Sequence, residues 1–228
     1  MADLPDIPRA EAAIVDRTNV FRQTEGLGTV RRDPALDRAA KAFARYLART
    51  GRFSHEADGR KPADRAQAAG YWFCTIAENL ALNLDSRGFT VEKLARETME
   101  GWKNSPGHRR NLELPSVTEI GVGIAQAEGE PKFLSVQLLG RPRRLAYEFK
   151  VVNTSRVAVS YSFAGQDYDL PARATVTHKA CEPGGIHFKS AGGWLGGKRI
   201  DARYQAADKA RYEVHVDAGG KLRVEASR

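Results

Sequence analysis

The sequence predicts an α+β protein in which a helix-rich, layered domain is followed by a small all-β domain. Two patterns lead to this prediction. Apolar residues recur every three or four positions through most of the first hundred residues, whereas later ones alternate with polar residues, the period of a strand. The stretch Gly-Arg-Pro-Arg-Arg at 140–144 is typical of a domain boundary. We therefore place the first domain at residues 1–142 and the second at residues 143–228.

The first domain is expected to contain three or four helices. Residues 9–24 show helical spacing and are followed by glycines that end the helix. Asp33 and Pro34 supply a cap and a first-turn proline for a second helix, whose apolar stripe runs over about 15 residues. A short third helix is expected over residues 62–70. A fourth begins after the capping residue Thr90 and is broken at residues 105–107, Ser-Pro-Gly.

The strands expected in the first domain cover residues 120–124 and 133–139, which form a small sheet. Beyond the boundary, about seven short strands are indicated by period-two patterns and turn residues. They predict a compact β-sandwich or barrel, somewhat similar to an immunoglobulin domain. The glycine-rich segment Ser190–Gly197 precedes no expected helix and is interpreted as a mobile loop.

The net charge is +8, and the sequence places most of it in the second domain. Residues 143–228 hold 15 Lys or Arg and 9 Asp or Glu, whereas residues 1–142 hold 21 and 19. A basic surface attracts polymers rich in phosphate or carboxylate, so an anionic envelope polymer is one expected partner. The basic residues are scattered singly and no RNA-binding motif is present, so nucleic acid is not expected.

No apolar run approaches the roughly 20 residues that cross a bilayer. Residues 1–16 lack the pattern of a secretory signal, which leaves a cytoplasmic chain or a mature exported one. Cys74 and Cys181 are too few for a disulfide framework. They either pair in an oxidising compartment or remain two separate buried thiols.

Three short segments of the first domain concentrate residues with useful chemistry. They are Phe53-Ser54-His55-Glu56, Ala77-Glu78-Asn79-Leu80-Ala81 and the run from Ser105 to Asn111, which contains His108. Only five histidines occur in the chain, and two of them lie in these segments, beside expected helix ends. Loops carried on a rigid scaffold are where functional sites are commonly built.

In order, the motifs FSHEADG, AENLA, W..SPGHRRN and EIGVG resemble the CAP superfamily of cysteine-rich secretory, antigen 5 and pathogenesis-related 1 proteins, especially its short bacterial members. The resemblance covers roughly residues 10–140. It implies an α–β–α sandwich with a central cleft, in which His55 and His108 face each other beside Glu78. Many eukaryotic members carry a fourth cleft residue, a Glu three positions after a Trp. Here Ser105 takes that place after Trp102, so the four-residue set is incomplete.

His55, Glu78 and His108 allow three interpretations. Two imidazoles and a carboxylate are a reasonable ligand set for Zn²⁺ or another divalent cation, with His55 and His108 as the metal ligands. Such a metal would support hydrolysis with Glu78 as base. The trio could instead only tie three loops together. Ser54 and Ser105 neighbour the histidines, but no third residue would orient a catalytic triad.

The resemblance also implies export, to a secreted or periplasmic location. We expect a cleft that binds a small lipid-like or glycan ligand at the cell envelope, with Ser105, Asn79 and Trp102 as further contacts. The alternative is a metal-dependent hydrolase or peptidase, although a binding protein is favoured over an enzyme. Outside the cleft, His178, His187 and His215 lie in polar alternation and are expected to be exposed or loosely bonded.

Overall fold

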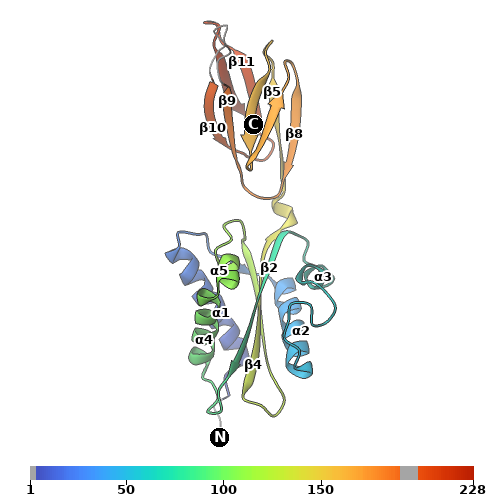
Figure 1. Ribbon diagram of the computed structural model, residues 1–228, viewed down its shortest axis with the longest axis vertical. Coiled ribbons are helices and arrows are strands. Elements are labelled where there is room, and N and C mark those ends of the chain that lie inside the picture. Colours follow the sequence, from blue (N-terminus) through green and yellow to red (C-terminus); the bar gives the residue numbers. More distant parts are fainter. Residues whose placement is uncertain (1–3, 191–199) are drawn as a thin grey trace. The chain divides into compact units, whose positions relative to one another are not determined.

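The computed structural model describes residues 4–190 and 200–228 and divides into two compact units, Met1–Arg144 and Leu145–Arg228 (Figure 1). Apart from Ser190, the glycine-rich segment interpreted as a loop lies outside the described residues. The elements of the first unit are α1 (Ile7–Thr24), β1 (Arg31–Arg32), α2 (Pro34–Thr50), α3 (Pro62–Ala68), β2 (Phe73–Leu84), α4 (Val91–Asn104), α5 (Pro106–Leu112), β3 (Glu119–Gln126) and β4 (Lys132–Pro142).

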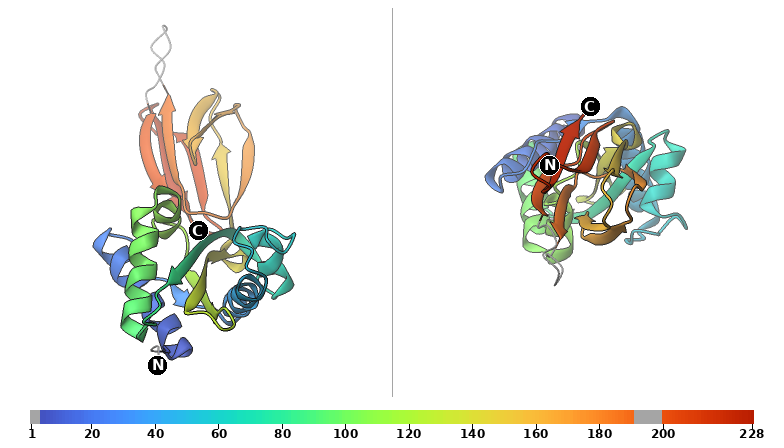
Figure 2. Two further views of the ribbon diagram at one scale, coloured as in Figure 1. Left: turned by 60° about the horizontal axis from the view of Figure 1, so that its bottom comes forward. Right: turned by 90° about the horizontal axis from the view of Figure 1, so that it is seen from above.

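The first unit is a sheet covered by helices on both faces, as expected for an α–β–α sandwich (Figures 1 and 2). The strand order is β1-β3-β4-β2, with β1 parallel to β3 and the other pairs antiparallel. On one face, α1 and α4 pack against a core that includes Ile120 and Phe133. On the other face, α2 packs against Leu134, Val136 and Leu138.

The helix starts follow the capping chemistry of the sequence. The Asp33 side chain accepts hydrogen bonds from the backbone N–H groups of Ala35 (2.8 Å) and Leu36 (3.1 Å) at the start of α2. Thr90 accepts from the N–H of Lys93 (3.2 Å) at the start of α4. These side chains accept hydrogen bonds from N–H groups that have no carbonyl partner in the first turn of a helix. The expected starts of these two helices are confirmed.

Two elements differ from the expectation. Residues 73–84, which include the AENLA segment, form the strand β2 and not a loop. Ser-Pro-Gly at 105–107 does end α4, but it also starts α5, because Pro106 has no N–H to lose and suits the first turn. Glu78 is therefore held on a strand and His108 on a helix, which gives both side chains a more rigid support than loops would.

Helix α2 lies directly on β3, and glycine makes this approach possible. A Cβ atom at Gly121 would lie 2.2 Å from the backbone carbon of Leu36, and one at Gly123 would lie 2.3 Å from the backbone nitrogen of Lys41. Both neighbouring atoms belong to the helix backbone, which cannot give way as a flexible side chain can. The Gly-Val-Gly pattern thus fixes the distance between α2 and the sheet.

The second unit contains two four-stranded sheets around one apolar core, in the order β10-β9-β6-β7 and β12-β11-β5-β8. About seven strands were expected and the described residues of this unit form eight, and β5 pairs in parallel with β11 where a sandwich of hairpins would be antiparallel. The strands are β5 (Tyr147–Asn153), β6 (Val159–Phe163), β7 (Gln166–Leu170), β8 (Thr175–Ala180), β9 (Gly185–Ser190), β10 (Ile200–Gln205), β11 (Arg211–Val216) and β12 (Leu222–Ser227).

The expectation that His178 is exposed is wrong. Its Nε2 lies 2.6 Å from the hydroxyl oxygen of Tyr161, and its ring stacks on Phe149 with the centroids 4.9 Å apart. Burial lowers the pKa of His178, because an apolar core disfavours the imidazolium. His178 therefore belongs to the core of the second unit.

We expect Gly123→Ala to destabilise the first unit by about 2 kcal/mol or more, because its methyl group would collide with the α2 backbone. Gly101→Ala is the matched control. Gly101 lies within α4, has no atom within 4 Å of the position that a methyl group would take, and should gain about 1 kcal/mol from helix propensity. Urea unfolding of both variants measures the difference, and equal free energies of unfolding would contradict the close approach.

Candidate functional site

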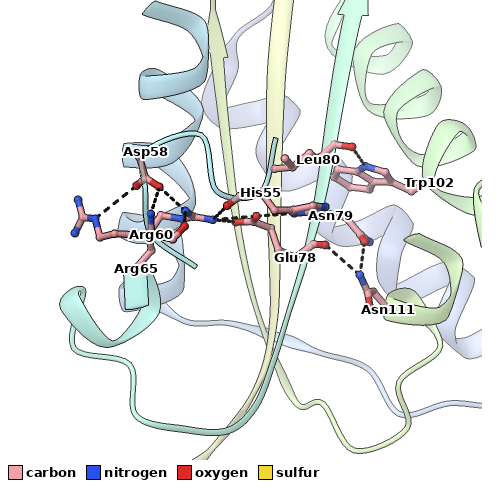
Figure 3. A network of polar contacts seen from close by, with 9 residues as sticks. All are labelled: His55, Asp58, Arg60, Arg65, Glu78, Asn79, Leu80, Trp102 and Asn111. Atoms are coloured by element: carbon pink, nitrogen blue, oxygen red, sulfur yellow. Dashed lines mark hydrogen bonds and ion pairs between the residues drawn. The ribbon is translucent and has the colours of Figure 1, made fainter. Parts of the chain in front are cut away.

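Glu78 is a buried carboxylate on the edge strand of the sheet. Strand β2 pairs only with β4 among the described strands, so its other edge is open to the segments that flank it. The Glu78 side chain is 1% exposed, yet both of its oxygens have partners. Oε1 lies 2.8 Å from Nδ1 of His55, and Nη2 of Arg65 lies 3.0 Å from Oε1 and 2.9 Å from Oε2 (Figure 3).

Arg65, on α3, organises this cluster. Its Nη1 donates to Asp58 Oδ1 (2.8 Å) and to the carbonyl oxygen of Arg60 (2.7 Å), and its Nη2 also donates to the carbonyl oxygen of His55 (2.8 Å). The guanidinium lies over the ring of Phe43, with 3.5 Å between Cζ and the ring centroid. One side chain thus ties the 55–60 segment to α2, α3 and β2.

The contact with Glu78 orients the ring of His55. A carboxylate accepts hydrogen bonds, so the hydrogen-bonded Nδ1 carries a proton, and in the neutral ring Nε2 keeps its lone pair. The His55 side chain is 49% exposed, so solutes can reach it. This arrangement presents one fixed imidazole nitrogen at the surface, supported from below by Glu78 and Arg65.

Asn79, the next residue on β2, points to the opposite face of the sheet. Its Nδ2 donates to Gln137 Oε1 (2.9 Å) and to the carbonyl oxygen of His108 (3.3 Å), and its Oδ1 accepts from Nδ2 of Asn111 (2.8 Å). Asn111 also donates to the carbonyl oxygen of Glu78 (3.0 Å). These bonds attach α5 to β2, so Asn79 positions the helix that carries His108.

His108 is half-buried near the start of α5. Burial lowers its pKa, and the charge of His55 lowers it further. The charge of His55 thus acts on His108, whose carbonyl oxygen lies 3.3 Å from Nδ2 of Asn79, the residue next to Glu78 on β2. The structure therefore brings His55, Glu78 and His108 into one neighbourhood at the open edge of β2.

The remaining candidates differ in accessibility. Trp102 is 1% exposed, and its Nε1 donates to the carbonyl oxygen of Leu80 (2.9 Å), which places it in the core. Ser105 is half-buried at the α4–α5 junction. Glu119, at the start of β3, is buried and contacts Arg31, Arg144 and the hydroxyl group of Tyr71.

The model of the cysteine-rich secretory protein family, CAP, matches residues 15–139, more than half of the chain. The chain belongs to the CAP family. It is 30% identical over 118 residues to the uncharacterized protein YkwD of Bacillus subtilis, an alignment that covers 51% of this chain and 43% of YkwD. The chain thus spans less than half the length of the curated relatives it matches.

Two solved structures are similar to this chain. We call the first unit, which contains the residues that the family model matches, the CAP unit. An outer surface protein of Borrelia burgdorferi has a TM-score of 0.53 and 20% identity, covering 62% of this chain and 99% of that one. An extracellular protein containing an SCP domain from Bacillus anthracis has a TM-score of 0.48 and 25% identity, covering 59% and 41%. The first likeness agrees with the α–β–α fold described above.

The CAP unit assembles the three named residues without forming an obvious metal centre. Among residues 4–190 and 200–228, no group of three or more His, Cys, Asp or Glu side chains is arranged to hold a metal ion. Both Glu78 oxygens are held by Arg65, so the carboxylate is not a free third ligand. The imidazoles of His55 and His108 are the donors that remain for a cation.

The sequence motifs do not reveal that Arg65 organises the site, and they assign no role to Asp58, Asn111 and Gln137. The first two lie inside the motifs FSHEADG and SPGHRRN, so the signal was present in their polar residues. Gln137 lies in an apolar strand, where a buried amide needs partners that only the fold can supply.

Arg65→Met should destabilise the CAP unit by about 3–5 kcal/mol, because it leaves the Glu78 carboxylate buried without its cation. Adding Glu78→Gln should restore part of the loss. The control is Arg60→Met, since the Arg60 side chain is exposed and its Asp58 contact is 3.6 Å. Chemical denaturation measures all three proteins, and an equal effect of Arg60→Met would contradict the hub role of Arg65.

The pKa of His108 should lie below about 6.5, the ordinary value for an imidazole. The substitution His55→Asn should raise the pKa of His108, because it removes the charge of His55. The pKa of His178, in the other unit, should not move. Because the unfolded chain protonates first, the stability linked to His108 should fall as the pH drops from about 6.5 to the folded pKa. NMR titration of the imidazole carbons measures these values. An unchanged His108 pKa in the variant would contradict the proximity of the two rings.

Proposed function

We propose that this CAP protein acts outside the cytoplasm, at the cell envelope, where the pair His55 and His108 binds a small hydroxyl-bearing ligand such as a glycan. The observation that supports it is the chain of contacts from Arg65 through Glu78 to Nδ1 of His55. A site that only tied segments together would not need an imidazole with half of its surface exposed.

The chemistry of the pair favours a polar ligand over a long apolar chain. With Nδ1 donating to Glu78, Nε2 of His55 can accept a hydrogen bond from a hydroxyl group. The lowered pKa of His108, due to burial and to the charge of His55, favours a neutral ring that can both donate and accept. Ser105 lies on the segment that leads into α5 and supplies a further hydroxyl group.

The proposed contacts are therefore His55, His108 and Ser105. Trp102 is left out because it is buried, and Asn79 is left out because its amide is used to hold α5. Both act by positioning the site. No step of hydrolysis follows from the arrangement, since both Glu78 oxygens are already engaged by Arg65 and His55.

Export is supported by the family, whose description is that of secretory proteins. None of the described helices is both long and apolar enough to cross a bilayer. The anionic envelope polymer considered for the second unit remains a proposal based on the excess of 15 basic over 9 acidic residues in 143–228.

The test is a titration of the protein with soluble cell-wall glycan fragments, followed by NMR of the histidine side chains. We expect shifts of His55 and His108 and loss of binding in His55→Ala/His108→Ala. His187→Ala is the control, because His187 pairs with Asp201 in the second unit (2.9 Å). Unperturbed His55 and His108 signals at saturating glycan would reject the proposal.

A parallel titration of chelator-stripped protein with Zn²⁺ addresses the metal alternative. Submicromolar binding that is lost in His55→Ala would assign the two imidazoles to a cation, with water or solute completing the coordination. Zn²⁺ binding that survives in His55→Ala/His108→Ala would place the metal elsewhere. The zinc-loaded and the chelator-stripped protein can each be retested with glycan, so that binding of the metal and binding of the glycan are distinguished.

A further inference from the structure

A hollow of the CAP unit, whose lining contains neither His55 nor His108, is lined by arginines. It has a volume of about 640 Å³ and lies between α2, the 58–60 segment and α3. Five of the residues that line it are arginines, and one is acidic, Asp58. The arginines are Arg38, Arg45, Arg49, Arg60 and Arg65. We call this hollow the α2–α3 groove.

The charge of the first unit is concentrated around this groove. Residues 38–65 hold eight Lys or Arg and three Asp or Glu, whereas the rest of residues 1–142 holds 13 and 16. Outside this segment the first unit is therefore net acidic. The near balance of charge over the whole unit hides a strongly basic face.

Within the described part of the chain, three of the groove arginines, Arg38, Arg45 and Arg49, form no ion pair. Arg38 donates instead to the carbonyl oxygen of Ala69 (2.9 Å). By contrast, Arg32 and Lys41 on the neighbouring flank are paired with Glu11. Arg45 and Arg49 also line a neighbouring hollow that contains Glu128 and Glu130. None of the three groove guanidiniums is held in an ion pair, so they are available to an external anion.

The geometry of α2 suits an elongated ligand. Arg38, Arg45 and Arg49 are exposed and seven and four residues apart, so they share one side of the helix and span about 16 Å along its axis. Short side chains, including Ala42 and Ala69, leave room between the guanidiniums. A compact monoanion cannot extend from Arg38 to Arg49, whereas a chain of anions can follow the row.

We propose that the α2–α3 groove binds the phosphate groups of a linear anionic polymer other than a nucleic acid. Guanidinium groups donate two parallel hydrogen bonds to a phosphate and keep their charge at every physiological pH. A row of them compensates repeated phosphates. The ligand contacts assigned here are Arg38, Arg45 and Arg49. Arg65 keeps its structural role, because its guanidinium is already held by Glu78 and Asp58.

The experiment is fluorescence anisotropy of labelled short-chain polyphosphate with the full chain at several salt concentrations. We expect Arg45→Gln/Arg49→Gln to weaken binding by roughly tenfold or more and to lower the slope of log affinity against log salt by about two. The matched control is Arg9→Gln/Arg110→Gln, which removes the same charge from exposed positions of the first unit that do not line the groove. It should bind almost as the wild type does.

Four outcomes would overturn the proposal. They are absence of binding, an equal loss in both double variants, equally tight binding of polyglutamate, and preference for a single-stranded oligonucleotide. Absence of binding or an equal loss in both variants would reject the groove as a binding site. Equally tight binding of polyglutamate would mean that the groove does not distinguish phosphates from carboxylates, and preference for the oligonucleotide would assign the groove to nucleic acid. His55→Ala/His108→Ala should bind polyphosphate normally, so failure here and failure of the glycan proposal can be told apart.

Discussion

The buried ion pair between Arg65 and Glu78 is the interaction on which the polar site depends. A carboxylate with 1% of its surface exposed would carry a large desolvation cost without a cation. Arg65 supplies that cation and uses its other donors to hold the 55–60 segment. The position of His55 therefore depends on the same arginine that pairs with the buried Glu78 carboxylate.

The same strand serves both faces of the sheet. Successive residues of a strand point in opposite directions, so Glu78 reaches toward α3 while Asn79 reaches toward α5. Because β2 is an edge strand, segments from the two faces can meet beside it, and the charge of His55 influences His108. An interior strand, flanked by neighbours on both edges, would keep the two histidines apart.

Local signals in the sequence predicted the elements with strong caps and strong periods. Asp33 and Thr90 start helices by bonding to their own first turns, which requires no knowledge of the rest of the fold. Strand β2 was missed because Glu78 and Asn79 interrupt its apolar pattern, and the partners that make them tolerable lie on other elements. The burial of His178 was not predicted for the same reason, since its hydrogen-bond partner, the Tyr161 hydroxyl group, lies on another strand, β6.

Site identity and site chemistry were therefore predictable to different degrees. The ordered motifs indicated His55, Glu78 and His108, but Glu78 as a metal ligand or base rested on residue types alone. Arg65 changes that chemistry, because it occupies both oxygens of the Glu78 carboxylate and leaves this carboxylate the task of orienting the His55 imidazole. The total charge of residues 1–142 likewise did not predict the α2–α3 groove. Its near balance conceals the arginines that α2 places along one side. What a charged residue can do depends on whether the fold has already given it a partner, and Arg65 and Arg45 are the two opposite cases in this chain.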